Sequence, residues 1–123
     1  MNDEKKKKEL FLEGLRQYKL MDYYESHEVW EELWSDYYLE DKKFIQGLIQ
    51  LSVSFVHLSN GNMIGANNLL KKSKGKFIQF SGRQRGIDIN ILLNQIEKVE
   101  LEYKKLKNPD NFQWDLVPKL ERK

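Results

Sequence analysis

The sequence contains no cysteine among its 123 residues. Disulfide bonds and thiolate metal sites are therefore excluded, and the absence fits a reducing compartment. The chain starts with Met-Asn-Asp-Glu and four lysines, and no apolar run long enough for a signal peptide follows them. We therefore expect a cytoplasmic protein.

Long apolar stretches are also missing. The longest, residues 44–58, is interrupted by Gln46, Gln50 and His57, so it is too short and too polar to span a bilayer. We expect no membrane association. A chain of this length has room for one domain with a real core. We expect a single helical domain over residues 1–123, with its core at 9–106 and an irregular tail at 107–123.

Charges of one sign are absent from two long segments. Residues 20–41 hold eight acids and no base, whereas residues 42–87 hold eight bases and no acid. Such segregation indicates complementary faces, within the chain or between two copies, and a homodimer is therefore one expected partner state. It can also mark an anion-binding surface. The candidates for that surface are Lys71, Lys72, Lys74, Lys76, Arg83 and Arg85.

Helical periodicity predicts an all-α fold of five helices and no sheet. The helices are expected at residues 3–19, after the N-cap Asp22, at 42–59, from the N-cap Asn62 to about Phe80, and between the N-cap Asp88 and Pro109. Two similar turns lie forty positions apart, at Met21 and Gly61. They predict two helical hairpins of the tetratricopeptide kind and a closing helix, in a compact bundle.

The third predicted helix is apolar around most of its circumference, which is typical of a helix in the centre of a bundle. Its narrow polar strip must then face solvent, a cleft or buried polar partners. The strip consists of Lys43, Gln46, Gln50, Ser54 and His57.

Residues 24–34, Tyr-Glu-Ser-His-Glu-Val-Trp-Glu-Glu-Leu-Trp, concentrate the chemistry of the chain. His27 and Glu31 are one helical turn apart and are placed at the border of the apolar face, so we expect Glu31 to be partly buried and paired with His27. The predicted pocket residues are Glu13, Tyr24, His27, Glu31, Trp34, Gln46, Gln50 and His57.

Three kinds of chemistry fit these residues. His27, Glu31 and His57 could hold a divalent metal, or the His-Glu pair could act in acid/base catalysis. The same pair could instead only tie the helices together by hydrogen bonds. The spacing is not that of the His-Glu-x-x-His zinc proteases, because Glu31 stands where the second histidine would be.

Several short motifs resemble those of one family. They are Phe11-x-Glu13-Gly14, Tyr24-Glu25-x-His27-Glu28-x-Trp30-Glu31-x-x-Trp34, Gln46-Gly47-Leu48-Ile49-Gln50-Leu51 and Gly61-Asn62-x-x-Gly65-Ala66. Together they resemble the family called domain of unknown function 309 (DUF309), over roughly residues 9–80. Met21 and Ser26 depart from it, since the family tends to have glycine and alanine there. The resemblance implies an all-helical domain and no particular activity, because the family has no established function.

A protein- or ligand-interaction module without catalytic activity is the function that the sequence favours. Aromatic residues on helical hairpins are common anchors for partners, and Trp34 is the one placed to border a groove. No cofactor is expected, and a metal-binding or acid/base enzyme is the first alternative. Weak nucleic-acid binding through residues 71–85 is the second, although no nucleic-acid motif is present and the chain is only mildly basic.

Overall fold

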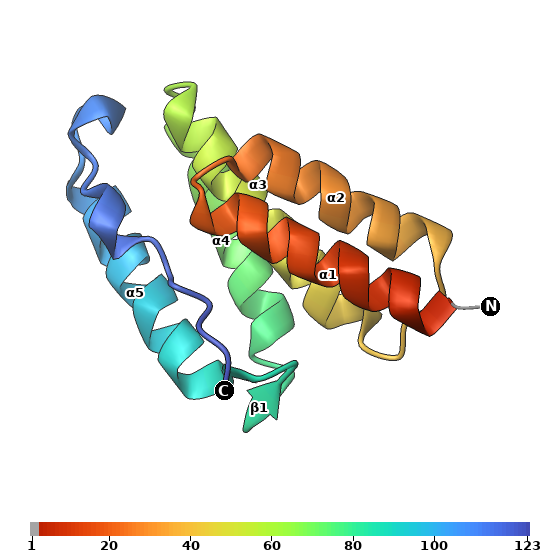
Figure 1. Ribbon diagram of the computed structural model, residues 1–123. Helices are drawn as coiled ribbons and strands as arrows, with labels where there is room; N and C mark the ends of the chain where they lie inside the picture. The colour runs from red at the N-terminus through yellow and green to blue at the C-terminus, as the bar shows by residue number, and fades with distance from the viewer. Residues whose placement is uncertain (1–2) are drawn as a thin grey trace.

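Five helices and a very small sheet make up the computed structural model, which describes residues 3–123 (Figure 1). The helices are α1 (Asp3–Lys19), α2 (Tyr23–Asp36), α3 (Lys42–Ser59), α4 (Met63–Phe77) and α5 (Ile89–Lys105). The predicted all-α class is therefore confirmed. The bounds predicted for the first and third helices are also confirmed, and α4 ends three residues before the predicted end at Phe80.

Polar side chains cap the N-terminal ends of three of these helices. Asp22, Asn62 and Asp88 each accept a hydrogen bond from the backbone N–H three residues further along the chain, at 2.9–3.0 Å. Each side chain thus satisfies one of the N–H groups that the first turn of a helix leaves free. Asp41 stands at the same position before α3 but makes no such bond, because its carboxylate has another partner.

The helices form two antiparallel hairpins, α1–α2 and α3–α4, and α2 packs on α3 to join them (Figure 1). Glycine permits the closest approach within each hairpin. A Cβ atom at Gly14 would clash with the indole of Trp30, and one at Gly47 would lie 2.8 Å from the ring of Phe77. The α5 helix then packs against α4 and closes the bundle.

Helix α3 is the central element, as predicted. It packs against both α2 and α4, and the side chains of Phe44, Ile45, Leu48, Leu51 and Phe55 are fully buried. Ser54, expected in the polar strip, is fully buried too. Its hydroxyl donates to the Ala66 carbonyl at 2.7 Å and lies 3.0 Å from the Tyr103 hydroxyl, so buried polar partners explain its position.

The glycine-rich segment after α4 contains the one departure from the predicted helical architecture. Strands β1 (Arg83–Gln84) and β2 (Ile87–Asp88) pair in an antiparallel hairpin, where no sheet was expected. The two residues between them, Arg85 and Gly86, have φ angles of 51° and 83°. Positive φ at both positions is the geometry of a tight two-residue hairpin turn.

The tail after α5, which we expected to be irregular over residues 107–123, runs back along the bundle (Figure 1). It contains the short turns η1 (Pro109–Asn111) and η2 (Trp114–Leu116), and it buries Phe112, Val117 and Leu120. The Tyr18 hydroxyl of α1 donates to the Pro118 carbonyl at 2.7 Å. Near its end the tail forms an isolated bridge between Arg122 and Ile87 of β2. Within residues 3–123, no helix combines the length and the apolar character needed to cross a membrane.

Candidate functional site

The predicted pairing of His27 with Glu31 is wrong. His27 Nδ1 lies 2.8 Å from the Tyr24 carbonyl, and its Nε2 lies 3.6 Å from a carboxylate oxygen of Glu28. A carbonyl can only accept, so Nδ1 carries the proton. Glu31 is exposed. The reason is the rotation of α2 about its axis, because the helix buries Tyr23, Ser26, Trp30 and Leu33 and so turns Glu31 toward solvent.

His57 belongs to a separate contact at the end of α3. Its Nδ1 lies 3.3 Å from the side-chain nitrogen of Asn62, and Gly65 of α4 packs against the ring. The amide nitrogen can only donate, so Nδ1 of His57 accepts this hydrogen bond. In the described part of the chain, no three His, Asp or Glu side chains come close enough to hold a metal ion. The predicted set of His27, Glu31 and His57 is therefore not assembled.

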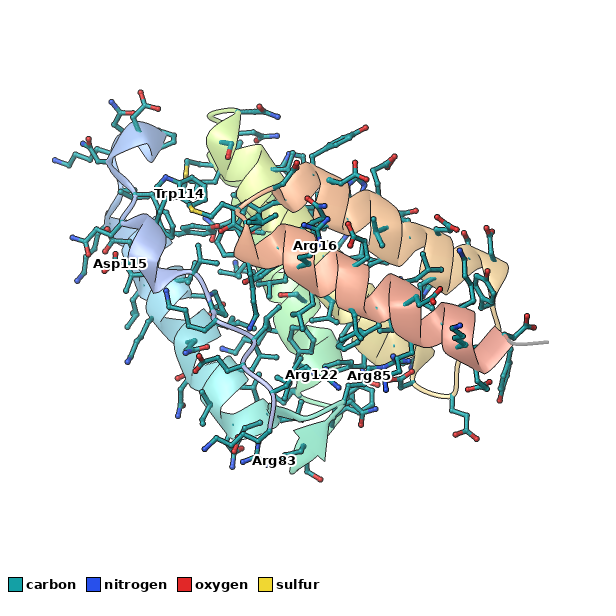
Figure 2. All side chains as sticks on the ribbon, in the orientation of Figure 1. Arg16, Arg83, Arg85, Trp114, Asp115 and Arg122 are labelled. Atoms are coloured by element: carbon teal, nitrogen blue, oxygen red, sulfur yellow. The ribbon has the colours of Figure 1, made fainter. Side chains whose placement is uncertain are left out.

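Glu13 and Tyr24, both predicted for the pocket, lie elsewhere on the surface. Arg16 donates two hydrogen bonds to the Glu13 carboxylate, at 2.9 and 2.8 Å, and Gln17 donates a third. The hydrogen bonds from Arg16 and then Gln17 lower the pKa of Glu13 to about 2. These are contacts within one helix (Arg16 is labelled in Figure 2). Tyr24 is 58% exposed and meets the His27 ring edge to face.

Half of the predicted pocket residues do line one cavity. Glu31 and Trp34 come from α2, and Gln46 and Gln50 come from α3. The cavity holds about 250 Å³ and is completed by Ile49, Val53 and Leu69. The sequence analysis missed these three apolar residues. Helical spacing was the available signal for two of them, because Ile49 and Val53 follow Gln46 at intervals of three and seven residues on α3.

Two polar atoms in the wall of this cavity lack partners. Trp34 Nε1 and Gln50 Oε1 are both buried, and neither has a hydrogen-bond partner within residues 3–123. Ser52 Oγ is the other buried side-chain atom of this kind in that range, and Ser52 does not line the cavity. A buried polar atom without a partner costs about 1–3 kcal/mol, and native proteins rarely tolerate it. Each of the two atoms has less than 1 Å² of exposed surface, so both lie behind the cavity surface and not open to an occupant.

Lys42 holds Trp34 in place at this site. Its ammonium group donates to the Trp34 carbonyl at 2.9 Å and lies 4.3 Å from the centre of the indole ring. The contact combines a charged hydrogen bond with a cation–π interaction. One side chain of α3, Lys42, thus contacts both the backbone carbonyl and the indole ring of Trp34. The indole is therefore held in one position by the fold itself.

Three of the six predicted anion-binding residues are paired with acids of the same chain. Lys74 pairs with Glu100 at 2.9 Å and lies 3.7 Å from Glu97, and the hydrogen bond that Lys74 donates to Glu100 is the main cause of the raised pKa of Lys74. Arg83 lies 4.0 Å from Asp88. Lys71 and Lys72 are exposed, and Lys76 is half-buried. Much of the positive charge in residues 71–85 is therefore neutralised by acids of the same chain.

Arg85 has the strongest of these internal partners. Its guanidinium donates to both carboxylate oxygens of Asp41, at 2.6 and 3.0 Å, and lies 4.8 Å from the centre of the Phe11 ring. Arg122 stacks on the same ring and donates to the Arg85 carbonyl at 2.9 Å. Figure 2 shows Arg85 and Arg122 side by side between the hairpin and α1, with Arg83 farther out. The acidic and basic segments thus meet within the chain, one of the two alternatives that the sequence left open.

Two larger cavities lie elsewhere. One of about 450 Å³ is bounded by Tyr23 and Trp114, and one of about 700 Å³ is bounded by Lys7, Tyr38 and Arg85. Neither is lined by a buried side-chain polar atom that lacks a partner within the described residues 3–123. Of these three cavities, only the smaller one at Trp34 is lined by residues that carry a fully buried side-chain atom without a hydrogen-bond partner in residues 3–123.

Comparison with known proteins finds a family model that matches part of the chain, but it finds no activity. The family described as "Domain of unknown function (DUF309)" matches residues 11–69, which confirms the resemblance seen in the motifs. An uncharacterised protein of Aquifex aeolicus (strain VF5) is 27% identical over 109 residues, covering 88% of this chain and 32% of that protein. The chain thus spans about a third of the length of this relative. No solved structure gives a significant match.

Proposed function

We propose that the DUF309 domain formed by residues 11–69 of this chain is an interaction module that binds a segment of a partner protein in the cavity between α2, α3 and α4. One observation carries the proposal. The side chains of Trp34, Gln46 and Gln50 line the cavity together with Ile49, Val53 and Leu69, so an aromatic ring, two amides and an apolar lining meet at one place.

The site has the composition of a recognition pocket. Ile49, Val53 and Leu69 supply apolar contact area, whereas Glu31, Gln46 and Gln50 supply the polar groups of the lining. Binding pockets typically combine an apolar lining with a few placed polar groups. Tryptophan is also enriched among the residues that dominate binding energy at protein interfaces.

The alternatives have less support from the geometry. An acid/base or metal-dependent enzyme built on His27, Glu31 and His57 would need these side chains together, and within residues 3–123 they form no cluster that could hold a metal. Nucleic-acid binding would use the cations of residues 71–85, and two of them, Lys74 and Arg85, are engaged by acids of the same chain. The same internal pairing favours a different protein over a second copy of this chain as the partner. We propose that the module acts in the cytoplasm, which the absence of cysteine supports.

The test is selection from a displayed library of short random peptides, followed by calorimetric titration of the enriched sequences. Leu69→Trp should fill the cavity and abolish binding. Trp34→Phe and Gln50→Leu should each weaken binding about 2–10-fold, because each changes one side chain of the lining and leaves the apolar walls in place.

The matched control is Gln113→Leu, the same change at an exposed position of the tail. It should leave affinity unchanged. If the library yields no binder, or if the enriched peptides bind the Leu69→Trp variant as well as the unchanged protein, the proposed function is wrong. Circular dichroism of each variant shows whether it is folded.

A further inference from the structure

We propose that the cavity between the α1–α2 turn and the C-terminal tail is a second binding site, which takes a small neutral aromatic molecule with a hydrogen-bond acceptor. This cavity, called the Tyr23 cavity below, holds about 450 Å³ and shares no lining residue with the cavity at Trp34. Its volume is in the range of cavities that hold whole small molecules. The lining residues that carry the argument are Tyr18, Met21, Tyr23, Trp114, Val117 and Pro118.

The hydroxyl of Tyr23 is the first reason for the proposal. Tyr23 is only 6% exposed, and its hydroxyl has no side-chain or backbone partner within residues 3–123. The fully enclosed polar side-chain atoms without a partner in that range belong to Trp34, Gln50 and Ser52, so the Tyr23 hydroxyl keeps some exposed surface. Because Tyr23 lines this cavity and is otherwise buried, that surface opens into the cavity.

Two other buried tyrosines show what the Tyr23 hydroxyl lacks. The Tyr18 hydroxyl donates to the Pro118 carbonyl at 2.7 Å, and the Tyr103 hydroxyl lies 3.0 Å from that of Ser54. A buried hydroxyl normally has such a partner. A ligand in the cavity would supply the partner for Tyr23.

Aromatic contacts fix the direction in which the Tyr23 hydroxyl points. The Tyr23 ring stacks on Trp114, with centroids 6.0 Å apart and an interplanar angle of 16°. It also meets the edge of Tyr18 and the tilted ring of Phe55, both with centroids at 5.3 Å. The hydroxyl is therefore in place before a ligand binds, which lowers the entropy cost of binding.

The chemistry of the lining selects a neutral ligand with an acceptor. Burial raises the pKa of Tyr23 to about 12, so the phenol is protonated at physiological pH and donates to an acceptor such as a carbonyl oxygen. The charged residues of the lining are two cations and two anions, so they favour neither sign of ligand. They are Lys19, Lys119, Asp115 and Glu121 (Asp115 is labelled in Figure 2).

The walls select an aromatic ligand. The half-buried ring of Trp114 lies beside the apolar side chains of Val117 and Pro118 and the thioether of Met21 in the lining. Aromatic rings pack favourably both on other rings and on thioether sulfur. An aromatic ring is therefore expected to bind more tightly here than a saturated ring of the same size.

The backbone of Met21 is a second, independent reason. At the end of α1, the Met21 N–H donates to the Tyr18 carbonyl and the Asp22 N–H to the Gln17 carbonyl, both at 2.9 Å. This pattern ends a helix with one residue at positive φ, which is usually glycine. Here that residue is Met21, with a φ of 66°.

The matching turn after α3 shows that the fold needs no side chain at this position. Gly61 donates to Leu58 and Asn62 to His57 in the same pattern, and Gly61 has a φ of 78°. Met21 is 56% exposed, so burial within the described residues does little to offset the cost of its positive φ. Its flexible side chain lines the Tyr23 cavity and is placed to adapt to the shape of a ligand.

The experiment titrates the protein, labelled with ¹⁵N and with ¹³C in the methionine methyl groups, with five probes of similar size. They are acetophenone, ethylbenzene, cyclohexyl methyl ketone, benzoate and benzylammonium. The reporters are the Trp114 indole N–H and the Met21 methyl signal, assigned by their loss in Trp114→Phe and Met21→Gly.

Acetophenone should shift both reporters and bind about fivefold more tightly than ethylbenzene, which has the ring but no acceptor. Cyclohexyl methyl ketone keeps the acceptor but lacks the aromatic ring, and it should bind about threefold more weakly than acetophenone. The two ions should bind most weakly, because each must lose water without gaining a matched charge.

Tyr23→Phe tests the hydroxyl alone. Acetophenone and ethylbenzene should bind this variant equally, and its melting temperature should not fall, because the removed hydroxyl has no partner within residues 3–123. Tyr38→Phe is the matched control, since Tyr38 is 77% exposed and does not line this cavity. It should keep the preference for acetophenone.

A pair of opposite exchanges tests Met21. Met21→Gly should raise the melting temperature, because it relieves the positive φ, and should weaken acetophenone about threefold by removing the thioether contact. Gly61→Met should lower the melting temperature and leave the affinity unchanged. Nothing lies within 4 Å of a Cβ atom at Gly61, so the added side chain meets no obstacle there.

The proposal is wrong if acetophenone shifts neither reporter, or if any of the other four probes binds as tightly. It is also wrong if Tyr23→Phe keeps the full preference for acetophenone. If peptides from the displayed library shift the Trp114 and Met21 signals and acetophenone does not, the cavity is a docking surface for a protein and not a small-molecule site. Since the two cavities share no residue, these results do not depend on the proposed interaction module.

Discussion

Arg85, in the turn of the β1–β2 hairpin, binds the carboxylate of Asp41, the residue before α3, through two parallel hydrogen bonds. The Asp41 side chain is 14% exposed and that of Arg85 is 22% exposed, so the pair is largely removed from water. Gln84 adds a third hydrogen bond to the same carboxylate at 3.1 Å. This contact joins residues forty-four positions apart and fastens the hairpin to the entrance of α3.

The first prediction concerns this ion pair. Arg85→Gln should lower the free energy of unfolding by about 1–3 kcal/mol, because it leaves a half-buried carboxylate without its cation. Arg83→Gln is the control, and it should change stability by less than about 0.5 kcal/mol, because Arg83 is exposed and 4.0 Å from its acid. Urea unfolding followed by circular dichroism measures both. If the two variants lower the free energy of unfolding equally, the ion pair between Arg85 and Asp41 stabilises the fold no more than an exposed ion pair does.

The second prediction is a dependence on pH. Burial by itself raises the pKa of Asp41, but the hydrogen bonds and charge of Arg85, with the Gln84 amide, outweigh it and lower the pKa below 3.8. A carboxyl group whose pKa is lower in the folded state stabilises the protein above its unfolded pKa, and this contribution is lost as the pH falls through the folded value. The stability difference between the unchanged protein and Asp41→Asn should therefore be constant above about pH 5 and shrink below about pH 4. If this stability difference instead grows as the pH falls, the pKa of Asp41 is not lowered in the folded protein and the prediction is wrong.

The third prediction compares two glycines inside helices. Gly14→Ala should destabilise the protein by about 1–3 kcal/mol, because the new methyl group would overlap the fully buried indole of Trp30. Gly75→Ala should instead stabilise it by about 0.5–1 kcal/mol, because nothing lies within 4 Å of the new atom and alanine loses less backbone entropy in a helix. Thermal melts of the two variants give the signs directly. The same sign for both would mean that α1 and α2 adjust freely around Trp30.

The fourth prediction concerns the cost of keeping Gln50 unpaired. Gln50→Leu should raise the free energy of unfolding by about 1 kcal/mol, because it removes a buried oxygen that has no partner within residues 3–123 and retains a side chain of similar size. Binding sites often sacrifice stability in this way. Gln113→Leu, on the surface, should change stability by less than about 0.5 kcal/mol. A loss of stability in Gln50→Leu would show that the amide is satisfied in the folded protein.

Much of the helical architecture follows from interactions between residues close in sequence. Asp22, Asn62 and Asp88 cap helices through backbone groups only three residues away, so the sequence alone locates where these helices begin. The apolar spacing of α1 likewise identifies its buried face, because any partner must contact the same stripe. The hairpin turn at Arg85 was missed because arginine rarely adopts positive φ and nothing local announces it.

The candidate site was predictable in part. Trp34, Gln46 and Gln50 were assigned to one pocket because helical spacing places them on facing sides of α2 and α3, and they do line one cavity. Glu31 also reaches its rim, but its expected burial and its pairing with His27 were wrong. Spacing defines which residues share a face, whereas the angle at which that face meets its neighbour depends on packing. A small rotation of α2 about its axis is therefore enough to move the Glu31 carboxylate from the expected buried position to the exposed one.

The sequence by itself determined the helices, their caps, the central place of α3 and the resemblance to the DUF309 family, because each depends on local propensity, on the period of the apolar residues or on short motifs. Only the tertiary structure decided that Arg85 binds Asp41, that Ser54 lies beside the Tyr103 hydroxyl and that Tyr18 holds the tail at Pro118. These partners are 44, 49 and 100 residues apart. It also decided that Trp34 Nε1 and Gln50 Oε1 remain unpaired. Whether a buried polar atom finds a partner depends on the relative position of whole helices to within the length of a hydrogen bond, and no periodicity in the sequence encodes distances that fine.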